Sequence, residues 1–285
     1  AQLSHPGREM TLAADGTHPV AYAPSTVPNE RFHVVPRELP LLLIKEIIDG
    51  FEVSAAHMRQ AGLDGVELVA SHGYLLGQFL NSNINQRSDA YGGSRAGRMR
   101  FLQEAIAATR RGAGEDMVLG VRLSGEEKDH HGVEIDEMLE VCAAMDANPA
   151  LDYLNVTAGT SAGLAGSTHI VPPMAYEAAY TAPIAAAIKA RVSKPVFVAG
   201  RINQPQIAVA VLQSGQADMC GMTRALISDP QMPAKAARGA ISDIRACVAC
   251  NQACIGHMLN ACAISCIQHP ETGRELEFGN LVPTT

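Results

Sequence analysis

Short apolar runs alternate along this chain with longer segments in which apolar residues recur every three or four positions. The short runs have the length of buried strands, and the longer segments have the period of amphipathic helices. Asn203 and Asp229 stand where helix N-caps are expected, and Pro230 suits a first helical turn. The pattern predicts strands over 66–69, 118–123, 153–156, 196–198 and 218–222, each followed by a helix, over 97–111, 135–145, 180–192, 205–213 and 230–238. It also predicts a helix over 40–60 and the end of a sixth strand over 1–4.

This alternation of strands and helices predicts a parallel sheet with right-handed crossovers. An eightfold barrel and a doubly wound sheet both satisfy it. A doubly wound dinucleotide fold should carry Gly-x-Gly-x-x-Gly after its first strand, and this sequence has no such motif. We therefore expect a (β/α)8 TIM barrel that lacks its first two strands in this chain. We expect residues 1–240 to form the barrel portion and 241–285 to form a cysteine-rich segment.

Composition and charge narrow the class of protein. The 285 residues are 47% apolar and 18% charged, which indicates a folded protein with a sizeable core. No apolar run approaches the roughly 20 residues that span a bilayer, so no membrane partner is expected. The formal charge of −7 argues against a nucleic-acid partner, because such a surface would be basic.

Cysteines provide the most specific chemical signal. Five of the seven lie within residues 247–266. Four of these thiols, at spacings of two, three and eleven residues, can converge on one iron–sulfur cluster or on zinc. Structural zinc sites usually pair two Cys-x-x-Cys hairpins, and only one such pair occurs here, so the spacing favours iron–sulfur. Cys262 is interpreted as a bystander, and Cys142 and Cys220 as core thiols. The expected ligands are Cys247, Cys250, Cys254 and Cys266.

Two polar residues follow the expected strand 66–69, where a barrel keeps its active site. The phenol of Tyr74 can deliver a proton, and the imidazole of His72 can orient a substrate. Alternatively, both side chains hydrogen-bond loop backbone. Downstream, Arg87, Asp89 and Arg98 indicate a loop-fixing ion-pair network rather than chemistry.

Charged and small residues also stand at the ends of later strands. Gly200 and Arg201 follow one strand, and Thr223 and Arg224 follow the next. The last turns of an eightfold barrel commonly bind phosphate, and guanidinium, hydroxyl and backbone N–H donors suit a dianion. Ordinary turn chemistry is the alternative. Arg122 lies in an earlier strand.

Together these segments resemble the old yellow enzyme superfamily. Within it they are most similar to the iron–sulfur branch that includes 2,4-dienoyl-CoA reductase, trimethylamine dehydrogenase and N-methyl amino acid demethylases. The resemblance is carried by Cys-x2-Cys-x3-Cys-x11-Cys after the last expected strand, and by Asn-Gln-Arg-Ser-Asp with Tyr-Gly-Gly-Ser after a Gly-Tyr-Leu turn. It implies an FMN-binding barrel with one 4Fe-4S cluster held by the four cysteines. It also implies flavin contacts at Gln2 and Arg122, a phosphate site at Gly200, Arg201, Thr223 and Arg224, and Tyr74 as proton donor.

Three features depart from the family pattern. Val69 stands where enone reductases carry the first of two polar substrate-binding residues, so only His72 remains. The stretch 157–167, where dienoyl-CoA reductases have a catalytic histidine, contains none; Ser161 lies near that place, and His169 could substitute only if the loop bends. Members of this branch continue into nucleotide-binding domains, so we expect FAD or NAD(P)H to act only through domains outside this chain.

Three functions follow as hypotheses. The first is oxidative demethylation of a small N-methyl amine or N-methyl amino acid by hydride transfer to flavin N5, because an apolar Val69 suits a substrate that needs no carbonyl donor. The second is NAD(P)H-dependent reduction of a conjugated C=C bond in an enoyl or dienoyl thioester, with Tyr74 as proton donor. The third is a non-catalytic electron-transfer fragment. The expected partners are a small-molecule substrate and an electron acceptor or NAD(P)H, with a homo-oligomer left open, in the reducing cytoplasm.

Overall fold

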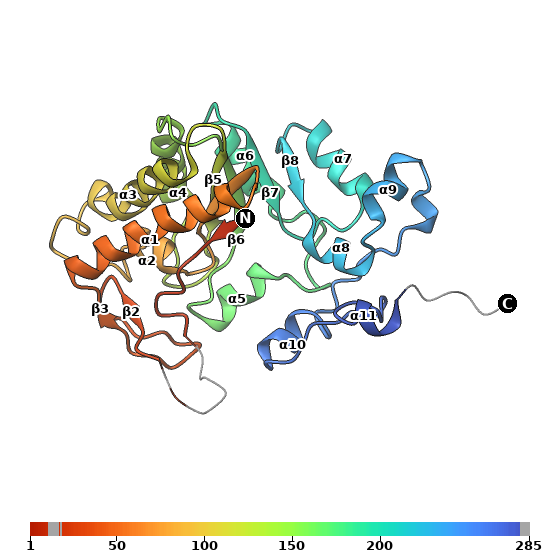
Figure 1. Ribbon diagram of the computed structural model, residues 1–285, viewed down its shortest axis with the longest axis horizontal. Coiled ribbons are helices and arrows are strands. Elements are labelled where there is room, and N and C mark those ends of the chain that lie inside the picture. The colour runs from red at the N-terminus through yellow and green to blue at the C-terminus, as the bar shows by residue number, and fades with distance from the viewer. Residues whose placement is uncertain (11–16, 18, 280–285) are drawn as a thin grey trace.

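The computed structural model describes residues 1–10, 17 and 19–279. Its main sheet has six parallel strands in the order β1-β4-β5-β6-β7-β8 (Figure 1). The predicted sixth strand at the N-terminus is confirmed, because β1 pairs in parallel with β4. The strand bounds are β1 Gln2–Leu3, β4 Gly65–Ala70, β5 Val118–Glu126, β6 Tyr153–Ala158, β7 Val196–Ala199 and β8 Met219–Gly221. Tyr22–Ala23 (β2) and Arg37–Glu38 (β3) form a separate small sheet.

Helices connect successive strands of the main sheet, as the apolar period predicts. The long helices are α1 Leu41–Gln60, α3 Arg95–Ala113, α4 Ile135–Asp146, α6 Ala182–Lys189 and α7 Pro205–Gln213. The shorter ones are α2 Leu75–Leu80, α5 Leu164–Ile170, α8 Thr223–Ser228, α9 Met232–Ala237, α10 Ile255–Leu259, α11 Glu275–Phe278 and the 3-10 helix Ile241–Asp243. None of the helices in the described ranges is both long and apolar enough to cross a bilayer.

Both predicted N-caps are wrong, because each side chain has a different partner. The residue that precedes α7 is Gln204, and the Asn203 amide instead donates to the carbonyl of Cys247 at 2.6 Å. Helix α9 begins two residues later than Pro230, after Gln231. The Asp229 carboxylate accepts from three nitrogens, which are the backbone N–H groups of Gln231 and Arg245 and the ammonium of Lys235.

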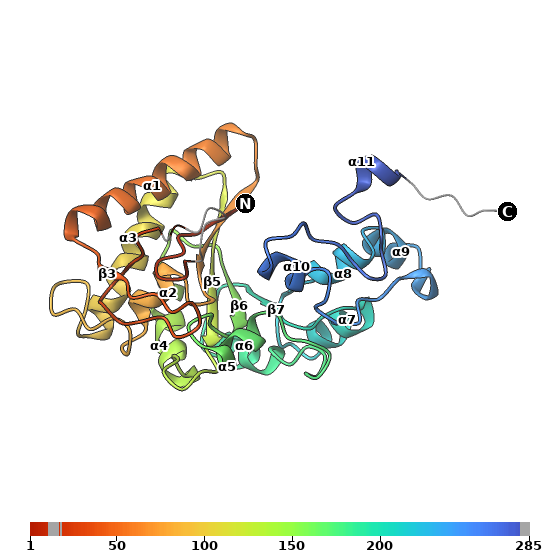
Figure 2. The same ribbon diagram turned by 90° about the horizontal axis from the view of Figure 1, so that it is seen from below.

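The outer face of the sheet forms the apolar core. Alternate residues of β4, such as Val66 and Leu68, are buried beneath the helices. Helices α1 and α3 lie against each other on that side (Figure 2). They approach so closely at Gly112 that a Cβ there would lie 2.0 Å from the carbonyl oxygen of Glu52. This packing holds the strands in place from outside.

The inner face of the sheet is polar. Glu67 projects from β4 and accepts hydrogen bonds from the amides of Gln2 and Asn155 and from the hydroxyl of Tyr153. A hollow of about 390 Å³ on this face is bordered both by Gln2 of β1 and by Met219 of β8. The two edge strands therefore face one space. The chain has an α/β fold of the TIM-barrel type, in which the described residues supply six strands.

Candidate active site

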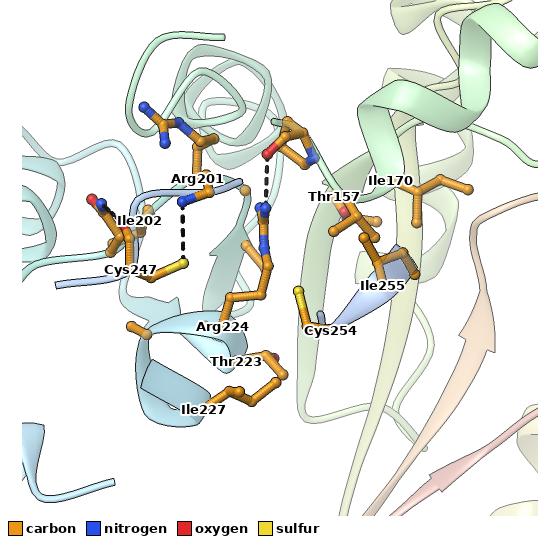
Figure 3. A pocket seen from close by; sticks show the side chains of 18 of the residues that line it. Thr157, Ile170, Arg201, Ile202, Thr223, Arg224, Ile227, Cys247, Cys254 and Ile255 are labelled. Carbon is orange, nitrogen blue, oxygen red and sulfur yellow. Dashed lines mark hydrogen bonds between the residues drawn. The ribbon is translucent and has the colours of Figure 1, made fainter. Parts of the chain in front are cut away.

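A cavity of about 330 Å³ lies beside the carboxyl-terminal ends of β6, β7 and β8 (Figure 3). We call it the strand-end cavity. The sheet register brings several sequence-predicted residues to it from separate turns. No carboxylate lines it among the described residues. The predicted residues that line it are His72, Arg122, Gly200, Arg201, Thr223, Arg224, Cys247 and Cys254.

The turns after β7 and β8 place two guanidinium groups at this cavity. Gly200 adopts φ +154°, and Arg201 adopts φ +58°, a left-handed conformation that is uncommon outside glycine. Arg201 donates from Nε to the carbonyl of Tyr176, and Arg224 donates from Nη1 to Pro172 and Asn251. Within the described chain their remaining guanidinium nitrogens have no protein acceptor, so they can bind an anion. Together with Arg122, this donor set fits a phosphorylated cofactor such as FMN.

The four predicted cysteine ligands border one small cavity next to the strand-end cavity. Cys247 and Cys254 line both cavities, with Arg224 between their thiols (Figure 3). Among the described residues, no three cysteine sulfurs lie within 4.8 Å of one another. A single tetrahedral zinc ion with Zn–S bonds of about 2.3 Å would need sulfurs roughly 3.8 Å apart. As they stand, no three of these sulfurs are spaced to bind one zinc ion together.

The other three cysteines stay outside this group. Cys142 is fully buried beneath the sheet, and burial raises the pKa of its thiol to about 12. Cys220 is half-buried and packs against the core, and Cys262 is exposed. Neither Cys142 nor Cys262 lines a cavity with the four predicted ligands.

A second and larger space, the outer cavity, adjoins the strand-end cavity and measures about 1010 Å³. His72 lines both cavities, and Tyr74 lines the outer one. Burial, with Arg122 nearby, lowers the pKa of His72 to about 3, so the imidazole is neutral, and its Nδ1 has no hydrogen-bond partner. Burial also raises the pKa of Tyr74, so the phenol stays protonated. The backbone of His72, rather than its ring, bonds the loop: its carbonyl accepts from the hydroxyl of Ser161 at 2.6 Å.

Glu9 is a candidate that the sequence pattern did not reveal. It is 9% exposed, lines the outer cavity beside Tyr74, and is the one carboxylate among the cavity's described lining residues. Its Oε1 accepts from the Asn29 amide at 2.8 Å, whereas Oε2 is buried without a partner. Burial raises the pKa of Glu9 to about 7. The carboxyl group can therefore take up or release a proton near neutral pH. In the sequence, only the position of Glu9 after β1 pointed to a role at this site.

Several other expectations concern residues around these cavities. Gln2 lies on the inner face of the sheet beside Glu67, a residue that the sequence pattern did not single out. Gln2 does not line the strand-end cavity. Val69 is buried and lines neither cavity. Ser161 lines the outer cavity. His169 lines neither cavity, because its ring packs against Tyr176 and Tyr180 instead.

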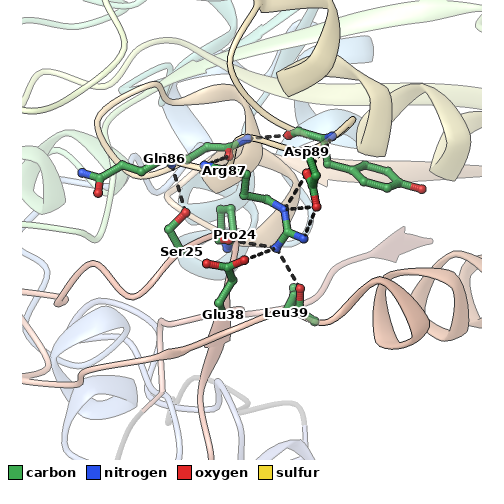
Figure 4. A network of polar contacts seen from close by, with 9 residues as sticks. Pro24, Ser25, Glu38, Leu39, Gln86, Arg87 and Asp89 are labelled. Carbon is green, nitrogen blue, oxygen red and sulfur yellow. Dashed lines mark hydrogen bonds and ion pairs between the residues drawn. The ribbon is translucent and has the colours of Figure 1, made fainter.

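The loop between α2 and α3 carries the predicted ion-pair network. The buried Arg87 guanidinium pairs with Asp89 and Glu38 and donates to the carbonyls of Pro24 and Leu39 (Figure 4). Arg98 does not join it, and pairs instead with Glu137 of α4 at 2.6 Å. The network is structural and lies outside both cavities.

Three arginines at one cavity of a barrel-type fold, with no carboxylate among its described lining residues, fit a protein that binds a phosphorylated cofactor. Comparison with known families makes this class specific. The chain belongs to the NADH:flavin oxidoreductase / NADH oxidase family, whose model matches residues 1–242. This is an FMN-dependent oxidoreductase family, and the resemblance to old yellow enzymes is confirmed.

Individual relatives differ in the reactions their names describe. The chain is 40% identical to a metal reductase of Desulforamulus reducens, over 100% of this chain and 42% of that protein. It is 34% identical to an N,N-dimethylglycine/sarcosine dehydrogenase of Chromohalobacter salexigens, over 96% of this chain and 39% of that protein. The structure of a 2-naphthoyl-CoA reductase matches with a TM-score of 0.87 at 28% identity, over 96% of this chain and 43% of that one. The chain thus spans less than half the length of these relatives.

Proposed function

We propose that the full-length protein is a flavin- and iron–sulfur-dependent oxidoreductase that oxidises a small N-methyl amine or N-methyl amino acid. The observation that carries this proposal is the Glu9 carboxyl group, buried beside Tyr74 in the outer cavity with an unpartnered oxygen. The similarity to the dimethylglycine/sarcosine dehydrogenase supports it. The family supports the flavin, and the four cysteines at one cavity support the cluster.

The cofactors would be held by residues already described. Arg201 and Arg224 would hold the FMN phosphate, and the four cysteines would ligate a 4Fe-4S cluster. FMN, when bound, supplies a two-electron acceptor, and the cluster passes electrons on singly. Because Arg224 borders both cavities, it would lie between the two groups. FAD or NAD(P)H would act through parts of the protein outside this chain.

The outer cavity would prepare the amine for oxidation. An ionised Glu9 attracts the ammonium form of the substrate and accepts its proton, and only the neutral amine is readily oxidised. Neutral His72 adds no positive charge that would repel the ammonium. Tyr74, protonated at neutral pH, donates a hydrogen bond that orients the substrate. The carboxyl group thus replaces Val69 as the feature that favours an amine.

Reduction of a conjugated C=C bond is the second candidate. Burial raises the pKa of Tyr74 and keeps its phenol protonated, as a proton donor to the α-carbon requires. Arg31 lines the same cavity and could bind a carboxylate or a phosphate of a thioester substrate. The structural similarity to 2-naphthoyl-CoA reductase supports this alternative.

Anaerobic absorbance spectroscopy of the full-length protein separates the two. Flavin bleaching by dimethylglycine or N-methylproline alone is the expected result. Bleaching by NADPH alone, with reoxidation by an enoyl thioester, would establish the reductase instead. Glu9→Gln is expected to slow reduction by the amine at least about tenfold, whereas Tyr74→Phe should slow it less and should abolish thioester turnover. A protein without a flavin band would contradict both candidates and favour a non-catalytic fragment.

A further inference from the structure

A third polar cluster lies away from both cavities, at a surface hollow of about 330 Å³. There the ligand atoms of Glu30, His130 and His131 all lie within 4.8 Å of one another, and all three side chains are exposed. We propose that these residues form a binding site for a divalent transition metal of the Zn²⁺ class. The proposed oxidoreductase chemistry does not involve them.

The orientation of His130 is set by a buried carboxylate. The side chain of Asp129 is 5% exposed, and its Oδ1 lies 2.9 Å from Nδ1 of His130. Its Oδ2 accepts from the backbone N–H of Gly166 at 3.1 Å, which fixes the carboxylate. A carboxylate on one ring nitrogen holds the proton there and raises the basicity of the other, as in many metal sites. Nε2 of His130 is therefore the nitrogen that would bind the metal.

The spacing of one pair of ligand atoms matches a tetrahedral ion, and the third ligand atom lies within 4.8 Å of both. Nε2 of His130 lies 3.4 Å from Oε1 of Glu30. Two ligands on a tetrahedral Zn²⁺ with bonds of about 2.05 Å would lie roughly 3.35 Å apart. The rings of His130 and His131 are 4.1 Å apart between centroids, so the two imidazoles lie next to each other. Because the site is open to solvent, water can complete the coordination.

The backbone around the two histidines is held in place by hydrogen bonds from neighbouring segments. The carbonyl of His131 accepts from the amides of Asn81 and Asn83, at 2.9 and 3.1 Å. Glu127 closes the loop, because its carboxylate accepts from the backbone N–H of Val133 at 2.9 Å. Such a loop loses little conformational entropy when it binds an ion.

The donor set selects the class of metal. Two imidazoles and one carboxylate suit Zn²⁺, Ni²⁺ or Cu²⁺, whereas Mg²⁺ and Ca²⁺ prefer sites made of oxygen. One cation, Arg8, also lines the hollow, but it donates from Nη1 to the carbonyls of Val27 and Pro28. The carboxylates of Glu30 and Asp129 offset its charge. A bound ion would tie the loop of His130 to the segment of Glu30.

The test uses the full-length protein with its cofactors loaded and kept anaerobic. Zn²⁺ is titrated by calorimetry, and Cu²⁺ is examined by electron paramagnetic resonance, which reports nitrogen ligands directly. We expect one Zn²⁺ per chain and hyperfine structure from two imidazole nitrogens. The double variant His130→Ala with His131→Ala should lose both signals. Asp129→Asn should weaken Zn²⁺ binding by about 10- to 100-fold, because Asp129 orients the His130 ring and does not itself bind the metal.

Two controls keep the result specific to this cluster. His57→Ala removes a histidine from helix α1, away from the cluster, and should leave the affinity unchanged. Flavin and iron contents are measured in each variant, so that lost cofactors are not mistaken for a lost site. Unchanged Zn²⁺ stoichiometry in the double variant would overturn the proposal. So would Zn²⁺ affinity no tighter in the parent protein than in that variant, which would leave Glu30, His130 and Asp129 as ion pairs without a metal.

Discussion

Replacing Glu9 by Gln tests whether a proton-binding carboxyl group lies in the outer cavity. The amide keeps the shape of the side chain, and its oxygen can still accept from Asn29. Burial raises the pKa of Glu9 from 4.5 to about 7 in the folded chain. One pKa unit corresponds to about 1.4 kcal/mol, so the ionised side chain costs folding about 3 kcal/mol.

The sign of the pH dependence follows from this shift. Between pH 4.5 and about 7 the folded chain holds a proton that the unfolded chain has released. The stability that this proton contributes is complete below pH 4.5 and is lost as the pH rises through about 7. From about pH 5 to about pH 8, the parent protein should lose about 2.5 kcal/mol relative to Glu9→Gln.

The measurement is urea unfolding of both full-length proteins, followed by circular dichroism at the two pH values. Both proteins carry the same cofactors, so cofactor contributions largely cancel in the difference. Glu46→Gln, on the exposed face of α1, serves as the control and should show no such effect. Equal pH dependence in the parent protein and in Glu9→Gln would refute the assignment of a raised pKa to this carboxyl group.

Three further changes test the cluster and the packing. Cys266→Ser should lower the iron content and the broad cluster absorbance, whereas Cys262→Ser, an exposed thiol, should leave both unchanged; equal iron loss in the two would contradict the ligand assignment. Arg87→Ala should cost about 3–5 kcal/mol in thermal or urea unfolding, because buried carbonyls and Asp89 lose their partner. A loss below about 1 kcal/mol would refute that role. Gly112→Ala should cost about 1–3 kcal/mol, since its Cβ would lie 2.0 Å from the carbonyl oxygen of Glu52, and unchanged stability would show that α1 yields freely.

Local sequence patterns were sufficient to predict a feature wherever a single segment of the chain contains all the residues that form it. The apolar runs of β4 to β8 and the end of β1 are evident because burial on a parallel sheet requires continuous or alternating apolar residues. The cysteine spacing likewise predicts a shared site, because the four thiols come from one short segment. Helix ends were less predictable. Asn203 and Asp229 have the chemistry of N-caps but bind Cys247 and Lys235, partners that only packing supplies.

The sequence by itself determined the order of the main-sheet strands and of the long helices between them, the cysteine set and the arginines that follow the last two strands. Tertiary structure alone decided which side chains share a cavity and which lose their water. It placed Glu9 beside Tyr74, kept Val69 and His169 out of the lining of both cavities, and joined Glu30 to His130 across 100 positions. The physical reason is that proton affinity and metal binding depend on desolvation and on distances between atoms that are remote in the chain. Neither desolvation nor such a distance can be read from a periodic pattern in the sequence.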